Sequence, residues 1–538
     1  MRITEMTKRN TKAAMVLAFA AMALFSLSSF AKVTVEFNVA GSSAMFNTFA
    51  LAGYGSATCG GNIWTFKNGA QGVDLRGGGA PVQTGNVWIE WDNSTSPTVV
   101  CSYLSVDSVV GNQLYFAQPT SVLNILEPAG TAGMNLVPTL TDTAGGLPSA
   151  VIAALESQAF NAAMTDIRPE DALFATNRAL GTLNTVNYNG LGYGPGPVGT
   201  PIQSFFSSKE ATPVGFALTG TDPISGQKAK SWTTLSVGAE PVLIFVNTTQ
   251  TSGGNGDFSN SNAFQNINRL DLTLALNGTY PYTRDISSAT GLQAVPVNVC
   301  LREPTSGTYN TLEFSIPRSV EINSTQELGV NPGVPGGNPL NIANAYSGGW
   351  RRRVIGTGEM VAQVANSANG DVLGYAFWST GNFANVQADV RYLTLDGVDP
   401  IFPSYSGGTL PPNCTSGCAG EVSFTNVING SYPAWTILRI ATAKTPPAGV
   451  QALLTNAQNA AINTIPDFVP FQYNGSQYLT VFHSHFSRPN TKCATGVSNG
   501  NGSEPVECGG DEGGGVFTLQ ADLDNYTDTG KELLSYHQ

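Results

Sequence analysis

The segment LREPTSGTYNTLEF, Leu301–Phe314, decides how the rest of the sequence is interpreted. It follows the apolar run AVPVNVC (294–300), which has the length and composition of a buried strand. The residues after Ser306 favour a helix, and Ser306 itself is a preferred N-cap residue. Arg302 stands at the junction, in a chain of which only 12% of the residues are charged. Because a helix N-terminus offers unpaired amides and a partial positive charge, this junction predicts an anion-binding turn.

Strands alternate with helices along most of the chain. Predicted strands include VCSYLSV, NAAMT, AEPVLIFVN (239–247), GDVLGYAFWS and YPAWTILRIAT. This alternation is typical of α/β layers with mainly parallel sheets, in which ligands bind beyond the carboxyl ends of the strands. Small hydroxyl residues occupy three strand-to-helix junctions: Gly41 to Ser43, Ser108, and Ser306 to Thr308. If these junctions converge, they form an uncharged site whose amides and hydroxyls donate hydrogen bonds to an anion.

The length of 538 residues predicts two or more domains with a sizeable core. Sixty Gly and 31 Pro residues indicate long surface loops. Three Gly-rich insertions are expected, at 60–85, 175–230 and 403–420, and the tail 491–538 is expected to be loosely ordered.

Residues 1–31 have the pattern of a secretory signal peptide. Basic residues precede the apolar run AAMVLAFAAMALF, and Ser29 and Ala31 stand at the small-residue positions of a cleavage site. The alternative is an uncleaved membrane anchor, for which the run is short. Cleavage removes four of the 25 basic and one of the 37 acidic residues, which leaves a net charge of −15. A chain this acidic does not suit nucleic acid or an anionic membrane.

Export permits disulfides among the seven cysteines. We expect Cys414 to pair with Cys418, Cys493 with Cys508, and Cys59 with Cys101, although the sequence does not fix the connectivity. Cys300 is then left as a buried apolar residue at a strand end. Zinc is the alternative use of these cysteines, but their spacing does not fit it, and no metal or other cofactor is predicted.

Several motifs resemble those of the phosphate-binding periplasmic proteins, the receptors of phosphate ABC importers. The similar segments, in the order of that family, are VAGSSAMFNTFA, YLSVDSVVGNQ, MTDIRPED, LDLTLALNGTY, REPTSGTYN and GDVLGYAFWS. They span roughly 35–480. The resemblance implies an α/β, two-lobed periplasmic-binding-protein fold of type 2, with a hinge and with long Gly-rich insertions.

The same resemblance implies a set of phosphate-binding residues. Ser43 with the Ala44 amide, and Ser108, match the hydroxyl and amide donors of the first two loops. Asp166 matches a buried carboxylate. The family's Arg-x-x-x-Ser-Gly-Thr loop corresponds to Arg302, Ser306, Gly307 and Thr308. The family often has an acid two residues after the arginine; here that position is Pro304, and Glu303 is the candidate substitute.

The chemistry of phosphate suits these residue types. Amides, hydroxyls and one guanidinium satisfy the unprotonated oxygens of phosphate, and a carboxylate accepts the hydrogen bond of a P–OH group. Fully ionised sulfate has no such proton. A site built around that bond can reject the analogue lacking it by as much as about 10⁴-fold. Asp166 is therefore predicted to discriminate between the two anions.

The resemblance also implies how the chain is divided. The first lobe would hold 34–175 and 390–490, and the second 176–389, so that the ligand bridges the lobes and favours closure. The implied partners are inorganic phosphate and the membrane subunits of an ABC importer. A periplasmic or secreted monomer is expected, and no catalytic residue is predicted.

Simpler interpretations of the same residues remain open at this stage. The serines are common N-caps, and Asp166 could cap the helix that Pro169 begins. The basic run GGWRRRV (348–354) is expected to be a solvated face. Two rival functions are an exported hydrolase, for which three histidines and no G-x-S-x-G elbow leave little support, and a secreted structural or adhesion protein that keeps the fold without transport.

Overall fold

The fold is described from a computed structural model of the chain. It describes residues 33–183, 214–249, 257–258, most of 264–473, and the pairs 476–477, 480–481 and 516–517. Within 264–473 the gaps are 281, 287–294, 317–340, 344–348, 405–406, 412–421, 429–430 and 460–464. The predicted signal peptide, two of the three predicted disulfides and nearly all of the tail lie outside the described residues.

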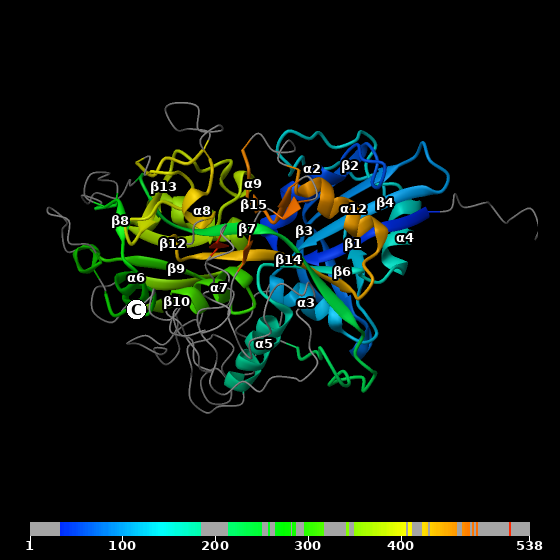
Figure 1. Ribbon diagram of the computed structural model, residues 1–538, viewed down its shortest axis with the longest axis horizontal. Helices are drawn as coiled ribbons and strands as arrows, with labels where there is room; N and C mark the ends of the chain where they lie inside the picture. The colour runs from blue at the N-terminus through cyan, green and yellow to red at the C-terminus, as the bar shows by residue number, and fades with distance from the viewer. Residues whose placement is uncertain are drawn as a thin grey trace, which may run out of the picture.

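The described chain forms two halves around one continuous sheet, shown side by side in Figure 1. The strands of the first half are β1 (Val33–Gly41), β2 (Asn62–Asp74), β3 (Ala80–Asp92), β4 (Thr98–Ser105), β5 (Val122–Ile125) and β6 (Ala162–Thr165). Its helices are η1 (Ser43–Met45), α2 (Phe46–Gly53), η2 (Leu75–Gly77), α3 (Ser108–Phe116), α4 (Ser149–Ser157), α5 (Pro169–Leu183) and α12 (Ala448–Ala457).

The second half contains the segment Leu301–Phe314. Its strands are β8 (Asn266–Ile267), β9 (Asn298–Arg302), β10 (Asn341–Ala343), β11 (Trp350–Val354), β12 (Val372–Phe377) and β13 (Val390–Leu395). Its helices are α6 (Arg269–Leu276), η4 (Thr283–Asp285), α7 (Gly307–Ser315), α8 (Gly356–Ala365), η5 (Ser367–Asn369), α9 (Thr380–Phe383) and α11 (Thr425–Ile428). Short pairs complete the set: β15 (Val469–Pro470) on β7, β16 (Gln472–Tyr473) with β17 (Ser476–Gln477), and β18 (Thr480–Val481) with β19 (Val516–Phe517).

A single long strand, β7 (Trp232–Asn247), joins the two halves. Residues 232–241 pair with β14 (Trp435–Ala443), which in turn pairs with β6 of the first half. Residues 242–247 pair instead with β12 and β13 of the second half. Figure 1 shows β7 running from one half into the other. The predicted two-lobed α/β class is thereby confirmed.

The pairing of β13 bears on where the lobes are divided. β13 begins at Val390 and pairs with β7 and β8, next to the strands that carry the second-half turns. The family resemblance implied that the chain returns to the first lobe at residue 390. We propose that the return comes after this strand, so that 390–395 belong to the second lobe.

The sheet is mixed, and not mainly parallel as predicted. β1 runs parallel to both β4 and β6, and β9 runs parallel to both β11 and β12. The pairs formed by β2, β3, β5, β7 and β14 are antiparallel. The parallel groups are those that end at the hydroxyl-rich turns. A ligand site is therefore still expected at the carboxyl ends of these parallel strands.

The predicted insertion at 60–85 is mostly a β-hairpin. β2 and β3 pair in antiparallel fashion from Asn62 with Trp91 to Asp74 with Ala80. Glycine was taken as a sign of a loop, but Gly72 lies in β2, where a Cβ atom would come within 2.4 Å of the Leu114 side chain on α3. Here glycine allows a helix to pack closely on a strand.

The basic run at 348–354 was predicted to be a solvated face, and that prediction is wrong for Arg351. Its residues Trp350–Val354 form β11, which pairs with β9 on one side and β10 on the other. Arg351 is buried, and its Nη1 atom donates to the carbonyl of Leu276 at 3.2 Å. The carbonyl group therefore satisfies a cation that the strand buries.

Buried side chains continue from one half into the other. The largest apolar cluster includes Phe49 and Trp88 in the first half, Val242 on β7, and Tyr375 in the second half. The predicted disulfide between Cys59 and Cys101 is confirmed, with 5.3 Å between the Cα atoms. Within the described ranges, no helix combines the length and apolarity needed to cross a bilayer.

Candidate anion-binding site

Three turns of the first half converge because the strands before them are neighbours. β1, β4 and β6 run parallel, and each ends at a turn that carries a hydroxyl or carboxyl group. The Ser42 hydroxyl donates to Asp166 Oδ2 at 3.1 Å. The Ser108 hydroxyl donates to the other oxygen, Asp166 Oδ1, in a short hydrogen bond. One buried carboxyl group thus gathers hydroxyl donors from two separate turns.

The first turn uses its two serines differently. Ser42, which the sequence analysis did not select, bonds to Asp166 and also accepts from the Ala44 amide at 3.2 Å. Ser43 points to the other half, where its hydroxyl lies 2.9 Å from that of Thr357. The pair of adjacent serines was the available signal, because in such a pair one hydroxyl can face each way.

The second turn contains a carboxyl group that sequence reasoning missed. The N-cap position of α3 is occupied by Asp107, and not by Ser108 as the simpler interpretation allowed. The Asp107 side chain accepts no hydrogen bond from a helix amide. Instead its Oδ1 accepts from Arg302 Nη2 at 3.1 Å, and its Oδ2 accepts from the Thr305 hydroxyl at 3.0 Å. The two residues of the ion pair are 195 positions apart in the chain.

The second half supplies Arg302 and the start of α7. Glu303 pairs with Arg302 through two bonds, from Nε at 3.0 Å and from Nη2 at 3.1 Å. The acid two residues after the arginine, expected from the family pattern, is therefore replaced by its immediate neighbour. Two parallel N–H···O bonds of this kind fix the plane of the guanidinium.

The N-terminus of α7 faces Asp166 directly. Ser306 is the N-cap, and its hydroxyl accepts from the Tyr309 amide at 3.3 Å. Among the described residues, the amides of Gly307 and Thr308 meet no hydrogen-bond acceptor, as is usual in the first turn of a helix. A Cβ atom on Gly307 would lie 1.4 Å from Asp166 Oδ1. Only glycine allows the helix to come this close to the carboxyl group.

Thr357, at the start of α8, was not predicted from the sequence. Its hydroxyl accepts from Arg302 Nη1 at 2.9 Å and also meets the Ser43 hydroxyl. The residue lies in a Gly-Thr-Gly segment with no preceding pattern of the family, so spacing gave no signal for it. Its place in the structure comes from α8 packing on β9 and β12.

Burial shapes the electrostatics of the site. Desolvation raises the pKa of Asp166 above its usual range, against the lowering effect of its Ser108 and Ser42 hydrogen bonds. Desolvation also raises the pKa of Asp107, and the nearby Glu303 carboxylate raises it further. For Glu303, burial acts in the same direction, but the Arg302 guanidinium outweighs it and lowers the pKa to about 2.

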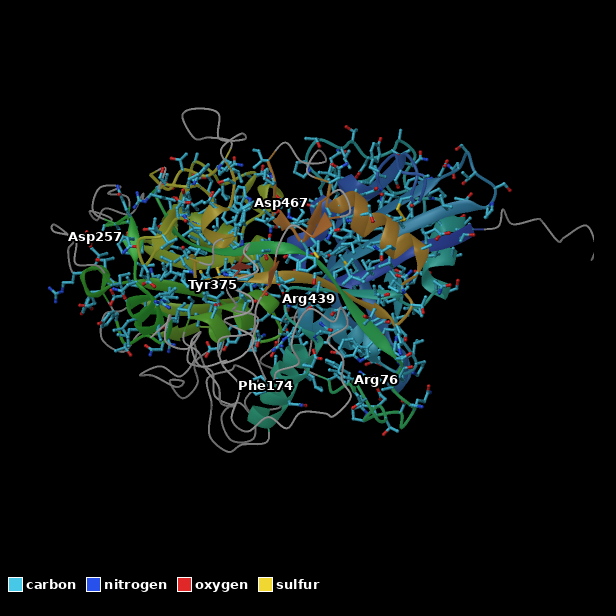
Figure 2. The ribbon with its side chains drawn as sticks, viewed as in Figure 1. Arg76, Phe174, Asp257, Tyr375, Arg439 and Asp467 are labelled. Atoms are coloured by element: carbon cyan, nitrogen blue, oxygen red, sulfur yellow. A yellow bond between two sulfur atoms is a disulfide. The ribbon has the colours of Figure 1, made fainter. Side chains whose placement is uncertain are left out.

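The predicted residues are thus found on two facing sets of turns. Ser43, Ala44, Ser108 and Asp166 come from the first half, and Arg302, Ser306, Gly307 and Thr308 come from the second. Tyr375, labelled in Figure 2, holds the backbone of the second set, because its hydroxyl accepts from the Arg302 amide at 3.1 Å. The arrangement brings amides, hydroxyls, one guanidinium and buried carboxyl groups together where the two sets of turns meet.

Comparisons with known proteins were made at the levels of family, sequence and structure. No family model matches the chain, and no curated protein matches it. A solved DING protein is 12% identical, with a TM-score of 0.35, over 81% of this chain and 90% of its own. A human phosphate-binding apolipoprotein is 12% identical, with a TM-score of 0.34, over 82% and 92%.

A third solved structure is an ABC-type phosphate transport receptor from Vibrio cholerae. It is 13% identical, with a TM-score of 0.25, over 59% of this chain and 83% of its own. The chain is similar, in its sequence motifs and in the solved structures that match it, to phosphate-binding proteins that include substrate-binding components of ABC transporters.

Proposed function

We propose that the chain binds inorganic phosphate, or a similar tetrahedral oxyanion, between its two halves. The observation that supports this most is the meeting of Asp166 with the N-terminus of α7. A carboxyl group that accepts a P–OH proton stands against helix amides that donate to the unprotonated oxygens, and the two come from different halves. A ligand held by both halves stabilises their closure.

Each contact has a defined part in this binding mode. The amides of Gly307 and Thr308, with the partial charge of the α7 N-terminus, donate to the oxyanion. The hydroxyls of Ser43 and Ser108 rotate to donate or accept as the ligand requires. Arg302 supplies the one positive charge. Asp166 accepts a hydrogen bond from a protonated oxygen of the ligand and so selects ligands that carry such a proton.

The biological setting belongs to the same proposal. The chain acts as an exported receptor, periplasmic or secreted, that delivers its ligand to the membrane subunits of an ABC importer and catalyses no reaction. The predicted signal peptide at 1–31 supports export. The ligand is inorganic phosphate, and the receptor acts as a monomer.

Titration calorimetry of the mature chain with phosphate tests the proposal. We expect micromolar binding, which corresponds to about −8 kcal/mol and is within reach of several charge-assisted bonds. Arsenate should compete, whereas sulfate should not. Asp166→Asn should narrow the difference between phosphate and sulfate by at least about tenfold, because an amide can donate to sulfate where the carboxylate repels it.

Arg302→Ala should abolish the heat of phosphate binding. Arg269→Ala is a matched control, because Arg269 lies on α6 and pairs with Asp396 away from the site. Equal loss in both variants would point to a general effect on folding. Phosphate binding that survives in a folded Arg302→Ala protein would remove Arg302 from the site.

One observation favours a second function, a secreted structural or adhesion protein. The guanidinium of Arg302 is already surrounded by acceptors within the protein, and two carboxyl groups share its charge. A protein that has lost transport would keep such contacts as structural bonds. A folded wild-type chain that binds neither phosphate nor arsenate would favour this alternative.

A further inference from the structure

All five N–H groups of Arg302 meet acceptors inside the protein. Nε donates to Glu303, and Nη2 donates to both Glu303 and Asp107. Nη1 donates to Thr357 at 2.9 Å and to Thr308 at 3.4 Å. A guanidinium has no further proton to offer. An oxyanion that uses Arg302 therefore has to take a donor from one of these partners.

Asp107 is the partner of Arg302 that comes from the opposite half. Glu303, Thr308 and Thr357 belong to the second half with Arg302, whereas Asp107 stands at the start of α3 in the first half. Its carboxyl group is 4% exposed and accepts from Arg302 and from the Thr305 hydroxyl. These are the kinds of donor that a bound oxyanion requires.

Further bonds join the halves around Asp107. The Val109 amide donates to the Thr305 carbonyl at 3.2 Å, so the first turn of α3 is bonded to the loop before α7. Gln83 on β3 supports the carboxyl group from its own half, because its Nε2 lies 3.4 Å from Asp107 Oδ2 and its Oε1 accepts from the Asp107 amide at 3.3 Å. The carboxyl group is thus held in place from both sides.

We propose that the Asp107 carboxyl group is a tethered competitor for the phosphate site, which latches the halves together and is displaced from Arg302 when an oxyanion binds. The competitor part of this inference rests on the function proposed above, and the latch part does not. The carboxyl group has the planar oxygen pair that a guanidinium prefers, and it is always present at the site. It therefore weakens the binding of every oxyanion that needs the same hydrogen-bond donors.

Asp107→Ala removes the competitor without removing a helix cap, because the Asp107 side chain accepts no hydrogen bond from α3. We expect phosphate to bind about tenfold more tightly to this variant, since one buried charge-assisted bond no longer has to be broken. Asp107→Asn retains one acceptor oxygen and should give a smaller gain. Phosphate affinity that is unchanged or weaker in a folded Asp107→Ala protein would overturn the competitor role.

Asp92→Ala is the matched control. Asp92 ends β3 beside the beginning of β4, at the opposite end of β4 from Asp107. Within the described part of the chain, its side chain bonds only to Ser94. The control loses the same carboxyl group and should leave phosphate affinity within twofold of the wild type. If Asp107→Ala does not fold, Thr305→Val removes the second donor that the carboxyl group takes from the opposite half and should also tighten phosphate binding.

The latch has a measurement that needs no phosphate. Solution scattering and hydrogen exchange are compared for wild type, Asp107→Ala and Asp92→Ala in phosphate-free buffer. We expect Asp107→Ala alone to show a larger radius of gyration and at least about tenfold faster exchange of the Val109 amide, which bonds across the halves. Unchanged values in Asp107→Ala would overturn the latch.

The two measurements separate the two proposals. If the wild type binds no phosphate but Asp107→Ala opens the halves, the proposed function fails and the latch stands. If the wild type binds phosphate but Asp107→Ala neither binds it more tightly nor opens, the function stands and the further inference fails.

Discussion

Asp166 and Asp107 are both buried carboxyl groups of the first half, and they follow β6 and β4, the parallel strands on either side of β1, yet their main donors come from opposite halves. Asp166 accepts from two hydroxyls of its own half, those of Ser42 and Ser108. Asp107 accepts from the guanidinium and the hydroxyl of the other half, those of Arg302 and Thr305. The same residue type therefore occupies two different bonding environments at the turns where the two halves meet.

The difference lies in what the donors can do next. A serine hydroxyl both donates and accepts, and it rotates freely, so the bonds to Asp166 can be rearranged around a ligand. A guanidinium only donates and has a fixed planar geometry, so the bond to Asp107 must be broken before the same proton can be used elsewhere. We infer that Asp166 selects the ligand, and that Asp107 sets the free energy of closing and opening.

The largest effect is expected when Arg302 is removed, because its guanidinium pairs with both Asp107 and Glu303. In Arg302→Ala, Glu303 and Asp107 remain as buried carboxyl groups with no cation between them. We expect a loss of about 3–5 kcal/mol in the free energy of unfolding, measured by urea denaturation at neutral pH. Arg269→Ala, at an ion pair whose side chains are 31% and 28% exposed, should cost less than about 1 kcal/mol. Similar losses in the two variants would contradict the buried network.

A smaller effect, confined to the Asp166 side, is expected from Gly307→Ala. The added methyl group would meet Asp166 Oδ1 and the Ser108 hydroxyl, so α7 has to withdraw from the carboxyl group. We expect phosphate binding to weaken and stability to fall by about 1–3 kcal/mol, as for an overpacked site. Calorimetry and urea denaturation measure the two quantities.

Gly358→Ala is the control for that substitution. Gly358 lies in α8, and a methyl group there meets nothing within 4 Å. Alanine should therefore stabilise the helix by up to about 1 kcal/mol and leave phosphate binding unchanged. If Gly307→Ala behaves like Gly358→Ala, the close approach of α7 to Asp166 is not part of the site.

The smallest effect is a difference in pH dependence. Burial raises the folded-state pKa of both Asp107 and Asp166, so each binds its proton more tightly when folded, and stability is lost as pH rises through the folded-state pKa. The slope is at most about 1.4 kcal/mol per pH unit for each group. Burial and the Glu303 carboxylate raise the pKa of Asp107 well above its ordinary value against the opposing effects of Arg302 and Thr305, whereas the Ser108 and Ser42 hydroxyls limit the rise in the pKa of Asp166. Asp107→Asn should therefore flatten the profile above pH ~4 more than Asp166→Asn does.

The pH profile needs urea denaturation at several pH values between about 4 and 8, where the unfolded carboxyl groups are ionised. Glu303 acts in the opposite sense, because its pKa of about 2 stabilises the fold at higher pH and is titrated only near that value. The titration of Glu303 therefore lies outside the pH range of the measurement. If the free energy of unfolding falls more steeply with pH in Asp107→Asn than in wild type, this would contradict a raised folded-state pKa for Asp107.

The sequence predicted the parts of the site that depend on local pattern. A buried strand, a hydroxyl N-cap and a glycine at the start of a helix are short-range signals, and β9 with α7 follows them closely. The strand β6 and the helix that begins at Pro169 were found in the same way. Each is decided by residues within one turn or one strand.

The contacts that sequence reasoning missed depend on distance in the chain. Asp107 looks like an ordinary helix cap until Arg302, 195 residues later, is brought against it. Thr357 has no pattern of its own and is placed only by the packing of α8. The hairpin of β2 and β3 was missed because its glycines were taken as loop residues, whereas Gly72 makes room for Leu114. In each case the cause is tertiary packing, which a local pattern does not contain.

The most direct test of a site shared by both halves is a crystal structure of the mature chain grown with phosphate. We expect one tetrahedral ligand that lies within hydrogen-bond distance of Asp166 on one side and of the Gly307 or Thr308 amide on the other, with Asp107 no longer bonded to Arg302. Phosphate bound to one half alone, or to a surface away from Asp166, would contradict it.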